Sequence, residues 1–575
     1  MSKRYLDNSN TDHRQPKRPR IIQVDSQDRL SLLSDELLLQ IFSFLPIPSL
    51  LICQRVSRRF HALAGDSELW KRQYYSRWVR PRARRVANIR YATLSASRAT
   101  YSPHVSTWLG HAHLAEEGKV TNWKGQYRLR HNWSKGICQV TEVELPQPAH
   151  SPMLVKFCAG FVFTADSEHG LRCWRASNQI SCSARLPLVE SESKTSAFPT
   201  ALAVSRCSRQ NLIKVTVGLA DGRFGVYDMD TQSLCLSLRS FHSAFADGAI
   251  TAMATSNSYL LMVSEHKVLS LYEMFLAEPK PPTRSNVANT SKQSSGEGVK
   301  LLASLKADSI LSPMSLSVRL AHSEIIASIV YSFFHIGCGW SLGIQELHFG
   351  KNGEQIGSRL ATTVNAQYGA MPLHPLTLSR RGYSSPFESG PSRGESHEEL
   401  TEPSILHQEP PTSISYSHPY LLTSHADNTL TVYLVVSTGA KLFVKGGQRL
   451  WGHTSSVAAV QVSDRGKAIS VSSRGDEIRV WELESLIPSL GSSKAAREEN
   501  SIQINPENKP CKIHECGPLL AGFLACQLCG PQLASGQMSR EYTQMGDCVG
   551  FDDERLLLSS RKETGTHLIE MYDFT

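Results

Sequence analysis

The sequence has no uninterrupted apolar run of the roughly 18 residues that a membrane-spanning helix needs. Its first 20 residues are polar and basic and lack the apolar core of a secretory signal. These absences exclude an integral membrane protein with helical spans and argue against secretion. The 13 cysteines among 575 residues are scattered, as is typical of reduced thiols. We therefore expect a protein of the nucleus, the cytoplasm or both, without a membrane partner.

Motifs that mark common enzymes are also scarce. The chain has no Gly-x-x-x-x-Gly-Lys-Ser/Thr phosphate loop and no His-Glu-x-x-His zinc motif. Single Ser, His and Asp residues are plentiful, but no order or spacing among them selects a catalytic triad. The sequence therefore predicts a non-catalytic protein without a cofactor and without a metal site.

Charge is unevenly distributed along the chain. Residues 1–100 hold 19 Lys and Arg against 8 Asp and Glu, whereas the remaining 475 residues hold 42 against 44. The formal net charge of +9 therefore belongs to the first sixth of the chain. This pattern disfavours nucleic acid as a partner of the whole protein. It also predicts an acidic partner at the N-terminal end.

Residues 1–28 are polar and basic, which predicts a disordered tail. Within them, Pro16-Lys17-Arg18-Pro19-Arg20 resembles a short nuclear-import signal. A solvated basic tail is the alternative.

Apolar residues recur at helical spacing between residues 29 and 78, which predicts a small all-α module. Ser34 can cap a first helix, which Pro46 and Pro48 should end. Ser49 can start a second helix, and Asp66 can cap a third. A core of this size is marginal by itself, so we expect the module to rest on a partner or on the rest of the chain.

The same residues, 29–78, resemble an F-box. The resemblance rests on the order of Asp35-Glu36-Leu37, Ile41-Phe42, Leu45-Pro46, Val56-Ser57-Arg58-Arg59-Phe60 and Leu69-Trp70. One departure is Leu33-Ser34, where the family usually has Leu-Pro. An F-box implies a Skp-type adaptor as partner and, through it, a cullin. The adaptor contacts implied by the resemblance and by helical spacing are Leu33, Ser34, Leu37, Ile41, Leu45, Pro46, Leu50, Cys53, Val56 and Trp70.

From residue 136 onward the pattern changes to short alternating strands that end in an aromatic residue, often after an Asp/Gly turn. These aromatics are Trp174, Tyr227, Tyr272, Tyr433, Trp481 and Tyr572. Their spacings of 53, 45, 161, 48 and 91 residues suit a propeller blade of about 40–50 residues, with one more blade in the long gap near Ile325 to Leu347. The sequence therefore predicts a mainly β protein, in which a seven-bladed propeller over residues 136–575 follows the all-α module. Polar stretches at 276–300, 351–412 and 484–545 are predicted to be loop insertions.

The sharpest repeat runs from Leu450-Trp451-Gly452-His453 to Trp481 and resembles a WD repeat. The resemblance implies a chain of hydrogen bonds among His453, Ser473, Asp476 and Trp481 that holds the blade together. Asp476 stands one place later than is usual.

Residues 79–135 should form a helical, basic connector between the two parts. The run from Asn122 to Trp133 resembles the connector of F-box proteins with WD repeats. Its rings, Trp123, Tyr127 and Trp133, alternate with cations, which also suits stacking on RNA. The alternative, rings packed on the propeller, is favoured by the usual burial of large aromatics.

Four cysteines near the C-terminal end, Cys511, Cys516, Cys526 and Cys529, could supply thiolates to a zinc ion. Their spacing is irregular, and an apolar run separates the two pairs, so buried core thiols are the favoured interpretation.

Arg474 is the one candidate for substrate binding, because it precedes a blade turn at a position where related propellers place phosphate-binding arginines. The equivalent positions Ala220 and Ala426 carry no charge, so an ordinary exposed turn arginine is the alternative.

The resemblances together imply a substrate-recognition subunit of an SCF-type ubiquitin ligase, similar to fungal F-box proteins with a WD-repeat propeller. The F-box would bind the adaptor and the propeller would bind a target protein, with the chemistry on other subunits. The alternative is a scaffold that recruits the adaptor without degrading a target.

Overall fold

The computed structural model describes residues 30, 32–80, 121–146, 153–175, 181–188, 198–207, 211–243, 248–274, 299–306, 311–321, 324–364, 405–438, 441–483, 501–504, 543–562 and 566–575. These residues form two compact units. The helical unit holds the described residues up to Val79 together with Asn122–Lys124, and the propeller unit holds Arg80, Thr121 and the described residues from Gly125 to Thr575.

The helical unit is built from short helices around a small apolar core. They are α1 (Asp35–Phe42), α2 (Ile47–Cys53), α3 (Arg58–Ala64), α4 (Ser67–Tyr74) and the π-helical turn η1 (Tyr75–Val79). Leu38 and Phe42 of α1 are buried, as are Leu50 and Leu51 of α2. Trp70 of α4 is also buried and donates its Nε1–H to the carbonyl of Ala64 at 2.9 Å. The all-α prediction for this region is confirmed.

The helix boundaries differ in detail from the prediction. Asp66 caps α4 as expected, accepting the N–H of Glu68 at 2.9 Å. Ser34 stands at the N-cap of α1, but its side chain makes no capping bond. Helix α2 begins at Ile47, before the predicted start at Ser49, because a proline fits the first turn of a helix, where its missing N–H costs nothing. The predicted second helix is two helices, because Ser57 caps α3 through the N–H of Phe60.

Helix α7 (Trp123–Lys135) occupies the predicted connector. In the propeller unit its ring Trp133 stacks on Phe574 with 3.6 Å between centroids and donates its Nε1–H to the carbonyl of Asp553. Lys467 Nζ lies 3.8 Å from the centroid of the Trp133 ring. Trp123, Tyr127 and Trp133 are all buried. The prediction that the rings pack on the propeller holds for Trp133, whereas Trp123 belongs to the helical unit and packs there on Tyr74 and Tyr75, with 5.6 Å between ring centroids in each pair. Because all three rings are buried, they are not available for stacking on bases.

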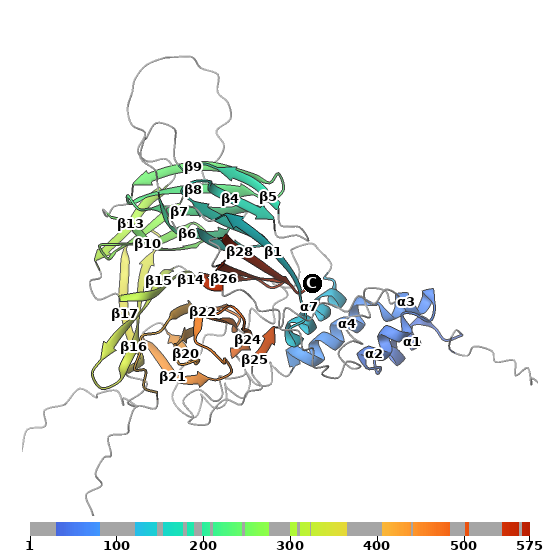
Figure 1. Ribbon diagram of the computed structural model, residues 1–575. Helices are drawn as coiled ribbons and strands as arrows, with labels where there is room; N and C mark the ends of the chain where they lie inside the picture. Colours follow the sequence, from blue (N-terminus) through green and yellow to red (C-terminus); the bar gives the residue numbers. More distant parts are fainter. Residues whose placement is uncertain are drawn as a thin grey trace, which may run out of the picture. The chain divides into compact units, whose positions relative to one another are not determined.

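Seven four-stranded antiparallel sheets form the propeller (Figure 1). We number the blades in chain order. Blades 1 to 3 consist of β2 (Leu154–Cys158), β3 (Phe161–Asp166), β4 (Gly170–Arg175), β5 (Ser181–Leu186), β6 (Pro199–Arg206), β7 (Leu212–Leu219), β8 (Arg223–Asp230), β9 (Cys235–Ser243), β10 (Ile250–Ser256), β11 (Tyr259–Ser264), β12 (Val268–Met274) and β13 (Val299–Lys306). Blades 4 to 6 consist of β14 (Leu311–Ala321), β15 (Glu324–His335), β16 (Gly339–Gly350), β17 (Gln355–Thr362), β18 (Ser413–Ser417), β19 (Tyr420–Ser424), β20 (Leu430–Ser437), β21 (Leu442–Leu450), β22 (Val457–Val462), β23 (Lys467–Ser472), β24 (Ile478–Glu482) and β25 (Ser501–Ile504).

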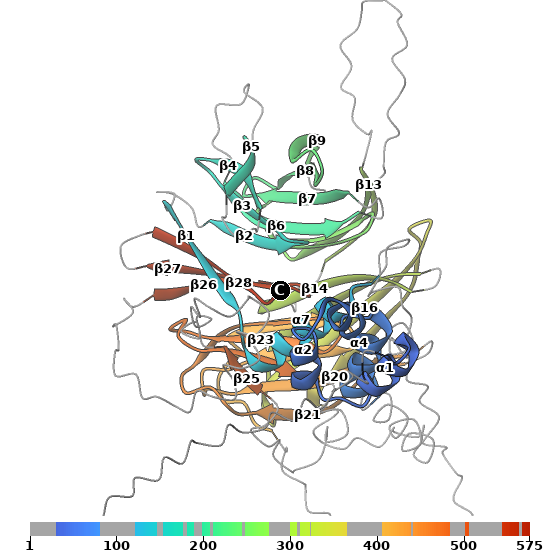
Figure 2. The ribbon, with the colours of Figure 1, turned by 90° about the vertical axis from the view of Figure 1, so that its right-hand side faces the viewer.

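Blade 7 joins the two ends of the propeller. It contains β26 (Thr543–Phe551), β27 (Arg555–Lys562) and β28 (Thr566–Asp573), and its outer strand is β1 (Gln139–Pro146). Strand β1 pairs with β28 from Gln139 opposite Asp573 to Pro146 opposite Thr566. Figure 2 shows β1 beside the red C-terminal strands. The first strands of neighbouring blades contact one another around the whole ring, so the seven-bladed prediction is confirmed.

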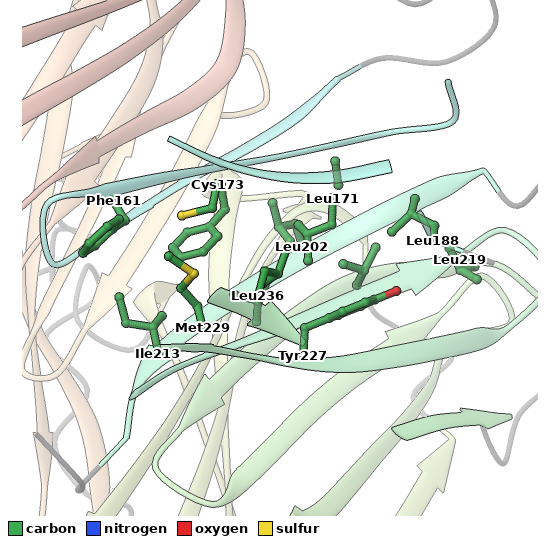
Figure 3. Packing of buried hydrophobic residues seen from close by; sticks show 14 residues of the cluster. Phe161, Leu171, Cys173, Leu188, Leu202, Ile213, Leu219, Tyr227, Met229 and Leu236 are labelled. Atoms are coloured by element: carbon green, nitrogen blue, oxygen red, sulfur yellow. The ribbon is translucent and has the colours of Figure 1, made fainter. Parts of the chain in front are cut away.

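Burial explains which strands the sequence pattern predicted. The second strands β3, β11 and β19 are buried along their whole length between neighbouring blades, so they are almost continuously apolar. One such contact, between blades 1 and 2, includes Phe161, Leu171, Ile213, Tyr227 and Met229 (Figure 3). Outer strands such as β5 and β9 are largely exposed or half-buried and carry no comparable apolar signal.

The predicted loop insertions need a correction for this reason. Strand β17 lies inside the predicted loop 351–412, and β25 and the start of β26 lie inside 484–545. Strand β13 begins at Val299, just within the predicted loop 276–300. Except for β26, these are outer strands, which need few apolar residues because one of their edges and part of their surface face water.

Among the described residues, no helix combines the length and apolar character needed to cross a membrane. The described residues also contain no group of three or more His, Cys, Asp and Glu side chains placed to hold a metal ion. The predicted alternative of a zinc site at Cys511, Cys516, Cys526 and Cys529 lies outside the described residues.

Candidate functional site: an exposed apolar face on the helical unit

The helical unit places many large apolar side chains in solvent. The exposed fractions are 55% for Leu37, 73% for Phe44, 60% for Ile52 and 64% for Val56. A domain this small gains nothing for its own core from these side chains. Exposed apolar side chains in this number on a small domain are typical of an interaction surface.

Helix α1 shows how the sequence produces this arrangement. Leu38 and Phe42 are one helical turn apart and face the core. There the rings of Phe42 and Phe60 pack edge to face, with 5.3 Å between their centroids. Leu37 and Ile41, also one turn apart, point away and are 55% and 41% exposed. The helix therefore has two apolar stripes, and the unit's own core covers only one of them.

The ten predicted adaptor contacts fall into three groups. Ser34, Leu37, Ile41, Pro46 and Val56 are exposed, and Leu33, Leu45 and Cys53 are half-buried. Leu50 and Trp70 are 0% and 1% exposed, so the prediction that they contact an adaptor is wrong. Both fill the centre of a core made by four short helices, where no partner can reach them.

Four further apolar residues of the helical unit are exposed and were not among the predicted contacts. They are Leu30, Leu32, Phe44 and Ile52. A strict helical period does not reach them, because Leu30, Leu32 and Phe44 stand in turns at the two ends of α1. The available signal was the apolar excess itself, since these short segments hold more apolar residues than one small core can bury.

Polar contacts fix the geometry of the unit. Gln54 donates its side-chain N–H to the carbonyl of Ala64 at 2.8 Å, and Lys124 Nζ donates to Gln54 Oε1 at 2.8 Å. The Lys124 ammonium also lies 5.7 Å from the Trp70 ring centroid, and burial lowers the pKa of Lys124. At the start of α1, the backbone N–H of Glu36 and the Ser34 side chain lower the pKa of the Glu36 carboxyl. A negative charge here suits the N-terminal end of the helix.

In the propeller, Arg474 lies exposed in the turn between β23 and β24, as predicted. Two other arginines come from the same end of blades 5 and 6. Arg479 Nη2 lies 2.7 Å from Glu477 Oε1, and Arg449 Nη1 lies 3.8 Å from Asp427 Oδ2. Because each of these two guanidinium groups already lies against a carboxylate, neither is available to bind a phosphate together with Arg474.

The hydrogen-bond chain of blade 6 exists, but two of its four members differ from the prediction. Trp481 donates its Nε1–H to Ser470 Oγ at 2.8 Å, and the Ser470 hydroxyl lies 2.6 Å from His453 Nε2. His453 Nδ1 in turn lies 3.3 Å from Glu477 Oε2. Burial lowers the pKa of His453 to about 4, so the ring is neutral at pH 7.

Ser473 and Asp476, which were predicted for this chain, bond elsewhere. Ser473 Oγ lies 2.6 Å from Ser456 Oγ, and Asp476 accepts the Ser472 hydroxyl at 2.5 Å. Ser470 stands opposite Arg479 in the β23–β24 pairing, and its side chain lies near Trp481, whereas Ser473 is already in the turn. A serine three residues earlier thus takes the role because it lies inside the strand.

One sequence motif was overlooked. Gly339-Trp340-Ser341-Leu342-Gly343 matches the Gly-x-Ser-x-Gly pattern of hydrolases. Ser341, however, lies within the antiparallel strand β16, is 2% exposed and donates its hydroxyl to the carbonyl of Gly339 at 3.3 Å. The pattern needs a strand-to-helix turn that exposes the serine, so this match has no catalytic context.

Two comparisons with protein families cover most of the chain. Residues 138–575 match the family model described as F-box protein pof12 beta-propeller, and residues 35–76 match the model described as F-box-like. The second match spans all of α1 to α4.

Curated relatives agree with these matches. The chain is 22% identical to F-box protein pof12 of Schizosaccharomyces pombe over 508 residues, which is 86% of this chain and 94% of that protein. It is 50% identical to F-box protein dre-1 of Caenorhabditis elegans over 50 residues, 9% of this chain and 5% of that protein. Among solved structures, Saccharomyces cerevisiae Sqt1 aligns at 10% identity with a TM-score of 0.33, over 74% of this chain and 97% of that one.

Proposed function

The chain belongs to the F-box protein pof12 beta-propeller family, and we propose that it is the substrate-recognition subunit of an SCF-type ubiquitin ligase. Its helical unit binds a Skp-type adaptor that carries the cullin, and its propeller binds the target protein. It contributes no catalytic group, because ubiquitin transfer needs only that the target be held near the charged enzyme. We place this activity in the nucleus, the cytoplasm or both.

The observation that carries the proposal is the outward stripe of α1. Leu37 and Ile41 are exposed side by side in a unit whose remaining apolar residues are enough to fill its core. Apolar side chains that become buried when two proteins bind supply most of the binding energy in protein interfaces. An adaptor with an apolar groove can therefore bind the unit without unfolding it.

The test is adaptor binding by the full chain with Leu37→Asp and Ile41→Asp. Two carboxylates in an apolar groove should weaken binding by at least 100-fold, since each buried unpaired charge costs several kcal/mol. The matched control is Ile356→Asp with Leu360→Asp, because these propeller residues are 59% and 60% exposed. Calorimetric titration with purified adaptor distinguishes the variants. Equal affinity of the two double variants would contradict the proposal.

Adaptor binding alone also fits the scaffold alternative, so a second measurement is needed. Cells that carry the Leu37→Asp, Ile41→Asp variant should accumulate proteins that the wild-type chain turns over. Proteome-wide half-lives compared with the Ile356→Asp, Leu360→Asp control report this directly. Unchanged half-lives, with adaptor binding lost, would favour the scaffold.

A further inference from the structure

The turn before α1 carries exposed apolar side chains that the helix itself does not hold. Leu30 and Leu32 are 52% and 76% exposed, and the turn is closed by the N–H of Leu33 bonding to the carbonyl of Leu30 at 3.2 Å. Ser34 follows at the N-cap without a side-chain capping bond. The Ser34 side chain therefore does not fasten this turn to the backbone N–H groups of α1.

Arg59, at the start of α3, forms hydrogen bonds that hold this turn against α1. Its Nη2–H donates to the carbonyl of Leu33 at 2.6 Å and to Asp35 Oδ1 at 2.6 Å, and its Nε–H donates to the same carboxylate oxygen at 2.8 Å. One planar guanidinium thus bonds the last residue of the turn and the first residue of α1 together. Only a fork of fixed donors can hold two acceptors in this way.

The base of this bridge is itself well anchored. Ser57 caps α3 by accepting the N–H of Phe60, and Phe60 packs on Phe42 in α1. The Arg59 side chain is 38% exposed and Asp35 is 58% exposed, so the ion pair adds little to the stability of the fold. These three hydrogen bonds are short and well directed, although they add little to the free energy of folding. Their main effect is therefore on the direction of the chain segment that they hold.

We propose that Arg59 is a positioning residue for adaptor binding: it fastens the turn to α1 so that Leu32 and the stripe Leu37–Ile41 form one preformed apolar surface. This inference rests on the proposed function. Without Arg59 the turn samples other directions and must be ordered when the adaptor binds, and ordering even one or two backbone residues costs affinity.

The test is titration of the purified full chain with purified Skp-type adaptor. Arg59→Ala should raise the Kd about tenfold, which corresponds to roughly 1.4 kcal/mol, with an unchanged melting temperature. Arg58→Ala is the matched control, because it removes the same charge from the neighbouring exposed position. Arg59→Lys should lie between the two, since a single ammonium can pair with Asp35 but cannot also hold the Leu33 carbonyl in fixed geometry.

Hydrogen exchange of residues 30–42 supplies the readout that a purely structural role would not produce. We expect faster exchange in the turn and unchanged exchange in α2 to α4 for Arg59→Ala. Equal affinity of Arg59→Ala and Arg58→Ala would overturn the inference, and so would unfolding of the whole helical unit in both Arg59 variants. If wild-type chain fails to bind the adaptor, or if Leu37→Asp with Ile41→Asp binds normally, the proposed function itself fails.

Discussion

The two units of this protein use apolar residues in different ways. The described helices α1 to α4 and their turns expose seven large apolar side chains, from Leu30 to Val56, while a core of about the same number of residues holds the helices together. The far larger propeller exposes ten, including Phe334, Ile336 and Trp451, and encloses several extended apolar clusters. The small helical domain thus leaves a large share of its apolar side chains in solvent, which is typical of a binding surface, whereas the propeller buries most of its apolar residues in its own core.

The largest expected difference between the two units is in how much folding stability each loses in acid. Burial lowers the pKa of His407 to about 3 and of His425 and His453 to about 4, although Asp427 and Glu477 oppose this shift. An unfolded histidine binds its proton near pH 6.5, so the unfolded chain gains protons first and propeller stability falls as the pH drops from about 6.5 to 4. Each ring should account for roughly 2 kcal/mol by pH 5. Urea unfolding at pH 7 and pH 5 checks this.

In the helical unit, the only histidine among the described residues, His61, is exposed. Hydrogen exchange resolved by unit should therefore show acid sensitivity in blades 5 and 6 and little in α1 to α4. His453→Gln should reduce the pH dependence, while His266→Gln, at an exposed site, should not. A parallel loss in both units would contradict the prediction.

The same Trp-to-Ala truncation should have different consequences in the two units. Removing a buried tryptophan costs about 3–5 kcal/mol. That equals the whole stability of a domain of this size, so Trp70→Ala should unfold the helical unit and leave the propeller folded. Trp133→Ala loses the Phe574 stack and the bond to Asp553, but should only lower the propeller's unfolding midpoint. Far-UV circular dichroism and denaturant titration measure both.

Trp451→Ala is the control for the truncation experiment, because this ring is 49% exposed. It should change neither unit by more than about 0.5 kcal/mol. If Trp70→Ala left the helical unit folded, the picture of a marginal core would be wrong.

A smaller effect tests the corrected hydrogen-bond chain of blade 6. Ser470→Ala leaves Trp481 Nε1 and His453 Nε2 without a partner in a buried site and should cost about 2–3 kcal/mol. Ser473→Ala, which removes only a partly buried bond to Ser456, should cost less than about 1 kcal/mol. Urea unfolding of the two variants decides which serine belongs to the chain, and a larger effect at Ser473 would restore the original prediction.

The smallest expected effect is an increase in the stability of the propeller. Lys214 is 1% exposed, its Nζ has no hydrogen-bond partner among the described residues, and the facing Asp228 pairs with Arg239 at 3.2 Å. Burial lowers the pKa of Lys214, so the unfolded chain holds this proton more tightly and the cost falls as the pH rises. Lys214→Met should therefore stabilise the propeller by about 1–2 kcal/mol at neutral pH, and less near pH 10. Exposed Lys156→Met is the control, and a loss of stability at position 214 would contradict the argument.

Much of this arrangement was predictable from particular residues. The order Asp35-Glu36-Leu37, Ile41-Phe42 and Leu69-Trp70 predicted the helical module, and Asp66 predicted its own cap. Buried strands with an aromatic end, such as β4 with Trp174 and β8 with Tyr227, predicted the blades. Strands β17 and β25 were missed because an exposed outer strand needs no apolar pattern.

Sequence alone determined the local character of each segment, because cap residues, turn glycines and apolar periods act over a few neighbours. Tertiary structure decided which apolar residues are covered, since Leu37 and Leu38 are chemically identical, yet Leu38 is buried and Leu37 is 55% exposed. It also selected Ser470 over Ser473, joined Arg59 to Leu33, and closed blade 7 with β1. Each of these contacts joins residues from different elements, and a contact across the fold leaves no periodic trace in the sequence.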